Sequence, residues 1–228
     1  MIVAEQKPLA EIKSMLGEAK RVLVVGCGTC VTVCFAGGTK EVAVLASTLR
    51  MSTQLDSKET VVDEVVVQRQ CEWEYIDPLL ATLDQYDLVV SLGCGVGVQT
   101  LAERFPKIRV VPGLNTMFMG LPTKTGEWEE RCQACGNCVL DQTGGVCPIS
   151  RCSKQLLNGP CGGSQNGKCE INQDVPCAWQ LIWERLTNLG RQQELLKVQP
   201  PKDWSTSRNG GPRRIVREDL QLPEGYRD

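Results

Sequence analysis

Thirteen cysteines dominate the chemistry open to this chain of 228 residues. Eight of them lie between residues 132 and 177, in a run that opens with Cys132-x2-Cys135-x2-Cys138 and reaches Cys147-Pro148. Three cysteines spaced two residues apart can wrap around one cubane iron–sulfur cluster, because small residues between them let the backbone N–H groups approach the sulfurs. A tetrahedral zinc site usually takes two cysteines from such a loop. The spacing therefore favours iron–sulfur clusters in this half of the chain.

The C-terminal cysteines are numerous enough for two four-cysteine sites. They are Cys132, Cys135, Cys138, Cys147, Cys152, Cys161, Cys169 and Cys177. We expect two [4Fe–4S] clusters in a ferredoxin-like domain, where the cysteine before proline serves the other cluster. By that analogy the first three take a distant fourth ligand such as Cys177, and Cys147 joins the second group. Spacing alone leaves the pairing open, and a later cysteine could instead be a small buried apolar residue.

The other five cysteines lie in loops that follow apolar runs in the first hundred residues. They are Cys27, Cys30, Cys34, Cys71 and Cys94. Loops at the carboxyl edge of one parallel sheet meet in space, and doubly wound folds bind ligands there. We therefore expect a metal site at this edge, either a third [4Fe–4S] cluster or zinc, with Cys27 as the spare of five candidates. The alternative is that Cys27 and Cys94 are core thiols and the loop holds a substrate.

The rest of the composition excludes several other chemistries. The chain has no histidine, which removes Ser-His-Asp and Cys-His catalysis, His-ligated zinc and haem on a proximal His. A net charge of −2 offers no basic surface to nucleic acid, and aromatic residues at 5% are too few for base-stacking platforms. Gly93-x-Gly95-x-Gly97 lacks the spacing of a dinucleotide loop, and no P-loop motif occurs.

We expect the thiols to be free rather than paired in disulfides. An odd number of cysteines fits disulfides poorly, and disulfides persist mainly in oxidising compartments. The N-terminus has no basic stretch followed by an apolar one, and no apolar run approaches the roughly 20 residues that cross a bilayer. The sequence therefore predicts a cytoplasmic protein without a membrane span.

Alternating apolar patterns predict the elements that position the N-terminal cysteines. Strands are expected at residues 21–25, 60–67, 88–92 and 108–111, and helices at residues 8–20, 41–50, 76–83 and 96–104. This alternation predicts an α/β fold with a small doubly wound parallel sheet of the Rossmann or flavodoxin-like kind. We assign residues 1–121 to this domain.

The composition changes after residue 121. Gly, Cys, Asn and Pro dominate residues 131–177. Such a stretch cannot build an apolar core of its own, so it needs bound metal or another cross-link to stay folded. One helix is expected at residues 179–198, and Pro200-Pro201 ends it. We expect residues 122–199 to form an irregular Cys-rich cluster domain closed by this helix. Residues 200–228 are expected to be an extended partner-binding tail with the apolar anchors Trp204, Ile215, Val216, Leu220, Leu222 and Tyr226.

Several motifs together resemble the iron–sulfur small subunit, of the MetV type, of bacterial methylenetetrahydrofolate reductase. They are Gly26-Cys27-Gly28-Thr29-Cys30-Val31, Gly93-Cys94-Gly95-Val96-Gly97-Val98-Gln99-Thr100, Arg131-Cys132-x2-Cys135-Gly136-x-Cys138, Leu157-Asn158-Gly159-Pro160-Cys161-Gly162-Gly163 and Pro200-Pro201-Lys202-Asp203-Trp204. The resemblance implies a partner, the flavin-containing catalytic reductase subunit, and a role in one-carbon folate metabolism, in a methyl branch of the Wood–Ljungdahl type. The small subunit would relay single electrons through [4Fe–4S] clusters to or from that flavin. The same resemblance leaves zinc open at the N-terminal site.

The residues by themselves favour a carrier over a catalyst. The chain has no histidine base, no phosphate loop and no paired-carboxylate motif, and clusters move single electrons while a flavin handles hydride chemistry. Two alternatives stay open: a zinc-binding structural or assembly subunit of the same complex, and a reductase with its own open-coordinated cluster at the N-terminal site. A further redox subunit or a ferredoxin would be an additional partner.

Overall fold

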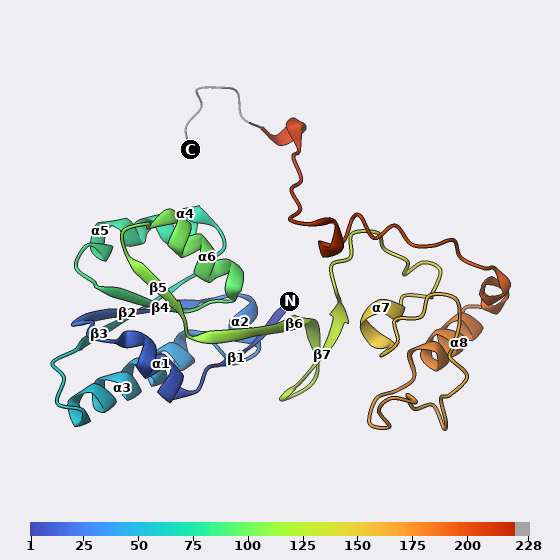
Figure 1. Cartoon of the computed structure of the whole chain (residues 1–228), viewed down its shortest axis with the longest axis horizontal. Helices are drawn as coiled ribbons and strands as arrows, with labels where there is room; N and C mark the ends of the chain where they lie inside the picture. The colour runs from blue at the N-terminus through green and yellow to red at the C-terminus, as the bar shows by residue number, and fades with distance from the viewer. Residues whose placement is uncertain (222–228) are drawn as a thin grey trace. The chain divides into compact units, whose positions relative to one another are not determined.

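The computed structural model describes residues 1–221, and the chain divides into two compact units, residues 1–130 and residues 131–228. The first unit contains a four-stranded parallel sheet (Figure 1). Its strands are β2 (Arg21–Cys27), β3 (Val61–Val67), β4 (Leu88–Leu92) and β5 (Arg109–Pro112), in the spatial order β3-β2-β4-β5. Since all three strand pairs are parallel, the expected α/β sheet is confirmed.

Helices cover both faces of this sheet (Figure 1). One face carries α1 (Leu9–Leu16) and α3 (Thr39–Leu55), and the other carries α4 (Trp73–Ile76), α5 (Leu80–Leu83) and α6 (Gly95–Arg104). A short helix, α2 (Cys30–Val33), follows β2, and a 3-10 turn, η1 (Asp77–Leu79), joins α4 to α5. The winding direction reverses between β2 and β4, which makes that position the topological switch point where open α/β sheets bind ligands.

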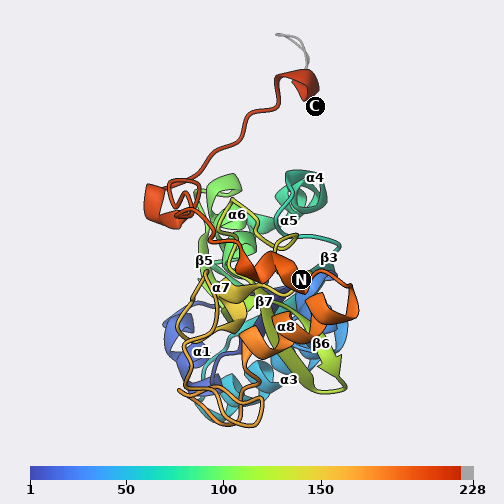
Figure 2. The ribbon, with the colours of Figure 1, turned by 90° about the vertical axis from the view of Figure 1, so that its right-hand side faces the viewer.

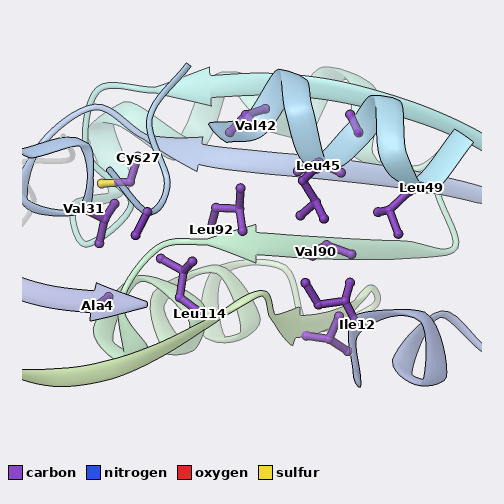
Figure 3. Packing of buried hydrophobic residues seen from close by; sticks show 14 of the residues in the cluster. Ala4, Ile12, Cys27, Val31, Val42, Leu45, Leu49, Val90, Leu92 and Leu114 are labelled. Atoms are coloured by element: carbon purple, nitrogen blue, oxygen red, sulfur yellow. The ribbon is translucent and has the colours of Figure 1, made fainter. Parts of the chain in front are cut away.

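The apolar core lies on both faces of the sheet because its central strands alternate between them. Val24 of β2 packs toward α1 and α3, whereas Val25 packs toward α4, α5 and α6. In Figure 3 the α3 residues Val42, Leu45 and Leu49 face the α1–α3 side of β4. Near-continuous apolar strands of this kind are typical of parallel sheets covered on both faces.

A second, antiparallel sheet was not anticipated from the sequence. It contains β1 (Ile2–Gln6), β6 (Leu114–Lys124) and β7 (Glu127–Cys132), in the order β1-β6-β7. Most of β6 is exposed and β7 is rich in charged residues, so neither strand shows a clear apolar alternation. Because the β6–β7 hairpin continues the sheet that begins with β1, the structure divides the chain after residue 130 rather than after residue 121.

The second unit is mostly irregular and has a small apolar core. Its helices are α7 (Pro148–Arg151), α8 (Ala178–Asn188), η2 (Gln192–Leu196), η3 (Arg208–Gly210) and η4 (Glu218–Leu220). α7 and α8 lie side by side in both views (Figures 1 and 2). The core cluster consists of Trp179, Ile182 and Leu186 of α8.

The helix expected at residues 179–198 ends ten residues early. Gly190 adopts a left-handed conformation with φ of 68°, which terminates α8 before the η2 turn. Within the described part of this unit, the only pairing beyond β7 consists of isolated bridges, Gln165 with Lys168 and Lys168 with Pro176. The ferredoxin-like arrangement therefore stays a prediction. None of the helices within residues 1–221 has the length and apolarity that a bilayer crossing requires.

Candidate metal and cluster sites

Three N-terminal thiols gather at the switch point of the parallel sheet. Cys27 is the last residue of β2, Cys71 lies in the loop after β3, and Cys94 precedes α6 as its N-cap. Partial desolvation raises the pKa of the Cys71 thiol, and the neighbouring Cys27 and Cys94 thiols raise it further. The three loops therefore do meet at the carboxyl edge, as the parallel sheet requires.

Cys30 and Cys34 lie at the two ends of the short helix α2. Cys34 is buried, and its sulfur accepts a hydrogen bond from the backbone N–H of Ala4 in β1 at 3.4 Å. Burial raises the pKa of the Cys34 thiol, and the nearby Cys30 thiol adds to that rise. Cys34 is thus tied to β1, whereas Cys27, the expected spare, lies near Cys71 and Cys94.

The loop that carries Cys30 and Cys34 is held against β4 by a glycine. A Cβ atom on Gly37 would lie 1.9 Å from the carbonyl oxygen of Leu92, so no side chain fits there. The carbonyl of Gly37 accepts a hydrogen bond from the Cys27 N–H at 3.0 Å. Close backbone contact therefore fixes the end of this loop, just before α3, beside the ends of β2 and β4.

Gln70 is a buried polar residue that sequence reasoning did not single out. Its side chain is 1% exposed, and its Nε2 donates a hydrogen bond to the Val25 carbonyl at 2.8 Å. The Ser91 hydroxyl donates to Gln70 Oε1 at 2.6 Å and accepts from the Gly93 N–H at 3.1 Å. This network ties the residue before Cys71 to β2, to β4 and to the residue before Cys94. In the sequence, the residue that could have indicated this network is Gly93, because a Cβ there would lie 2.2 Å from Gln70 Oε1.

The first three cysteines of the second unit lie on a loop that turns through left-handed backbone. Ala134 has a φ of 50° and Gly136 a φ of 81°. The Ala134 N–H donates a hydrogen bond to the sulfur of Cys132 at 3.3 Å, and the Cys135 thiol lies 3.8 Å from the Asn137 carbonyl. N–H groups directed at cysteine sulfur are characteristic of iron–sulfur loops, where they tune the cluster potential.

The other cysteines of this unit lie at helix ends and in turns. Cys147 precedes α7, Cys152 follows it and Cys177 precedes α8, and the last two pack against the small core. The Cys161 thiol donates to Glu170 Oε2 at 3.3 Å, and Cys169 lies 3.3 Å from the Ser153 hydroxyl. The hydrogen bond from Ser153, followed by bonds from the Ile171 and Asn172 backbone, lowers the pKa of the Cys169 thiol.

None of the thirteen cysteines, all of which lie within residues 1–221, forms a disulfide, so all of them could act as thiolate ligands to a metal. Thiolates without any histidine suit zinc, copper(I) and iron–sulfur clusters, and the loop of residues 132–138 fits the cluster alternative best. Within residues 1–221, no three Cys, Asp or Glu side chains gather closely enough to hold a single metal ion.

One comparison with known proteins bears on the second unit. Residues 111–205 match the family model described as methylene-tetrahydrofolate reductase C terminal. This segment, which makes up less than half of the chain, is therefore similar to the C-terminal part of methylenetetrahydrofolate reductase. The segment includes all eight cysteines of the second unit and none of the five in the first. No curated protein and no solved structure matches the chain.

Proposed function

We propose that this chain is the iron–sulfur subunit of a methylenetetrahydrofolate reductase complex and that it relays single electrons to or from the flavin of a catalytic subunit. The proposal rests on two features that occur in the same segment of the chain. The segment related to methylenetetrahydrofolate reductase contains eight free thiols in a unit with little apolar core. Metal or cluster ligation would supply the folding free energy that such a core lacks.

The residues that would hold two clusters are those of the second unit. Cys132, Cys135 and Cys138 would supply three ligands from one loop, and the remaining ligands would come from Cys147, Cys152, Cys161, Cys169 and Cys177. When bound, [4Fe–4S] clusters would supply one-electron transfer at a potential set by burial and by hydrogen bonds to sulfur. The chain contributes free thiols, the Ala134 N–H and a left-handed turn that holds the loop.

The N-terminal thiols would form a third site. We assign Cys27, Cys71 and Cys94 to it because they lie within electrostatic range of one another at the switch point. Cys30 would be the fourth ligand, since it follows Cys27 at the two-residue spacing of a metal-binding knuckle. Cys34 would be structural, because its sulfur is hydrogen-bonded to β1. Zinc and a third [4Fe–4S] cluster both suit this set of ligands.

Metal analysis of the anaerobically purified full chain tests this proposal. Two four-iron clusters predict about eight iron atoms and as much sulfide per chain, and a third cluster would add about four more. Cys135→Ser should remove one cluster, whereas Cys34→Ser should leave the iron content unchanged. A chain with fewer than about four iron atoms, and zinc in their place, would instead support a structural zinc subunit.

A further inference from the structure

Residues 202–213, which we name the strap, lie on the loop that carries the first three cysteines of the second unit. The Thr206 hydroxyl donates a hydrogen bond to the Cys135 carbonyl at 2.9 Å. The Lys202 ammonium donates to the Asn137 carbonyl, and the Arg213 guanidinium donates to the Ala134 carbonyl. Three donors from one segment thus reach three carbonyls of one short loop.

The strap is a folded segment, which corrects the expectation of an extended tail from residue 200 onward. Ser207 is buried, and its hydroxyl donates to the Trp204 carbonyl at 2.6 Å and accepts from the Asn209 N–H at 3.1 Å. The strap also lies close to the backbone of the loop. A Cβ on Gly136 would lie 2.3 Å from the Thr206 carbonyl oxygen, so the loop must carry a glycine at this position.

The strap brings two positive charges to the loop. The Arg213 guanidinium contacts the Ala134 and Thr206 carbonyls, and the Lys202 ammonium lies 5.3 Å from the Trp204 ring centre. Thiolate-ligated clusters become more negative when they are reduced. A nearby cation therefore stabilises the reduced form more than the oxidised form and raises the reduction potential.

We propose that the strap keeps the loop of residues 132–138 in its cluster-binding conformation and that Arg213 raises the reduction potential of the cluster held there. This inference rests on the proposed function, because it requires a cluster at Cys132, Cys135 and Cys138. It assigns Arg213 as a positioning and charge-bearing residue that does not ligate iron. The effect must depend on contact with the loop, since a distant exposed charge is screened by solvent and salt.

The adjacent arginine provides a matched control. Within residues 1–221, Arg214 makes no hydrogen bond or ion pair, whereas Arg213 reaches two carbonyls. Arg213→Gln and Arg214→Gln change the net charge of the chain equally. A difference between the two variants therefore reports the contact with the loop.

The test is an anaerobic redox titration of the full chain, followed by electron paramagnetic resonance, with iron content and thermal unfolding measured alongside. We expect Arg213→Gln to move one cluster to a more negative midpoint potential and Arg214→Gln to match the parent chain. Arg213→Lys should return that midpoint potential most of the way to the parent value. If Arg213→Gln loses iron instead, retention of iron in Arg213→Lys would support the role of the strap.

Equal midpoint potentials and equal iron contents in Arg213→Gln and Arg214→Gln would overturn the role of the strap while leaving the proposed function in place. A parent chain without iron would overturn both. The two failures are distinguishable, because only the second appears before any substitution is made.

Discussion

Cys34, Cys71 and Cys169 show how differently one residue type behaves in this chain. Burial raises the pKa of Cys34, partial burial and then the neighbouring thiols raise the pKa of Cys71, and a hydroxyl lowers the pKa of Cys169. Apolar runs in the sequence placed Cys27 and Cys94 in loops after strands, and in the structure Cys27 is the last residue of β2 and Cys94 lies two residues beyond β4. They did not indicate that Cys34 faces the core, because its partner Ala4 lies 30 residues away on an unanticipated strand.

Gln70 tests whether the hydrogen-bond network organises the N-terminal thiols. Gln70→Met keeps the volume but removes the acceptor of the Ser91 hydroxyl and the side-chain donor to the Val25 carbonyl, at a cost of about 1–3 kcal/mol in the free energy of unfolding. We also expect the zinc or iron affinity of this site to fall about 10–100-fold, as is usual when residues that orient metal ligands are changed.

Thr53→Val is the matched control, since Thr53 is buried in the same unit but bonds only to carbonyls of its own helix. Isothermal titration with zinc and chemical denaturation would measure both quantities in each variant. Equal metal affinities in Gln70→Met and Thr53→Val would contradict an organising role for Gln70.

The elements of the parallel sheet were predictable because its central strands, β2 and β4, are buried and almost entirely apolar, and the edge strands β3 and β5 still carry runs of valine. Residues 88–92 were placed correctly, and the other three strands to within two residues. The antiparallel sheet was missed because β6 and β7 expose most of their side chains, so that pairing rather than burial defines them. The strap was missed because it is held by hydrogen bonds to carbonyls, which leave no apolar pattern.

Gly37 tests the contact between the loop after β2 and the end of β4. Gly37→Ala places a methyl group against the Leu92 carbonyl and should lower the free energy of unfolding by about 1–3 kcal/mol or more. In Gly95→Ala the new methyl group would meet only Thr116 Oγ1 at 3.6 Å, so its effect should stay within about 0.5 kcal/mol. Urea denaturation would compare the two, and equal stabilities would show that the loop does not need this close contact.

At the scale of the whole molecule, the two units have different sources of stability. The first unit has extensive apolar clusters on both faces of its sheet, whereas the core cluster of the second consists of Trp179, Ile182 and Leu186. Composition alone indicated this contrast, since apolar periodicity ends where the Cys-rich segment begins. The path of the Cys-rich segment could not be predicted, because hydrogen bonds rather than a repeating apolar pattern hold it.

Removal of metal should therefore unfold the second unit selectively. After iron chelation under reducing conditions, we expect limited proteolysis to degrade residues beyond 130 while a fragment of the first unit persists, because ligand binding supplies folding free energy only where the core is small. Mass spectrometry of the fragments measures this. Degradation of both units at the same rate would contradict it.

The segment after the strap is the best candidate for a partner contact. Ile215 is 88% exposed and lies between η3 and η4, and Leu220 is 70% exposed at the end of η4. The anchors Leu222 and Tyr226 lie outside the described residues. Deletion of residues 214–228 should weaken co-purification with the flavin-containing subunit but leave the iron content intact, since the strap is kept. Deletion from residue 202 should also lower the iron content, and unchanged partner binding by the shorter deletion would exclude this segment as the contact.

Transfer of electrons to a flavin tests the central claim most directly. The full chain, reduced anaerobically with dithionite and freed of excess reductant, would be mixed in a stopped-flow spectrophotometer with the oxidised flavin-containing reductase subunit. We predict bleaching of the flavin absorbance at about 450 nm, in the usual range for oxidised flavin, with matching recovery of cluster absorbance, and a loss of that transfer in Cys135→Ser. A complex that forms without any change in the flavin spectrum would contradict it.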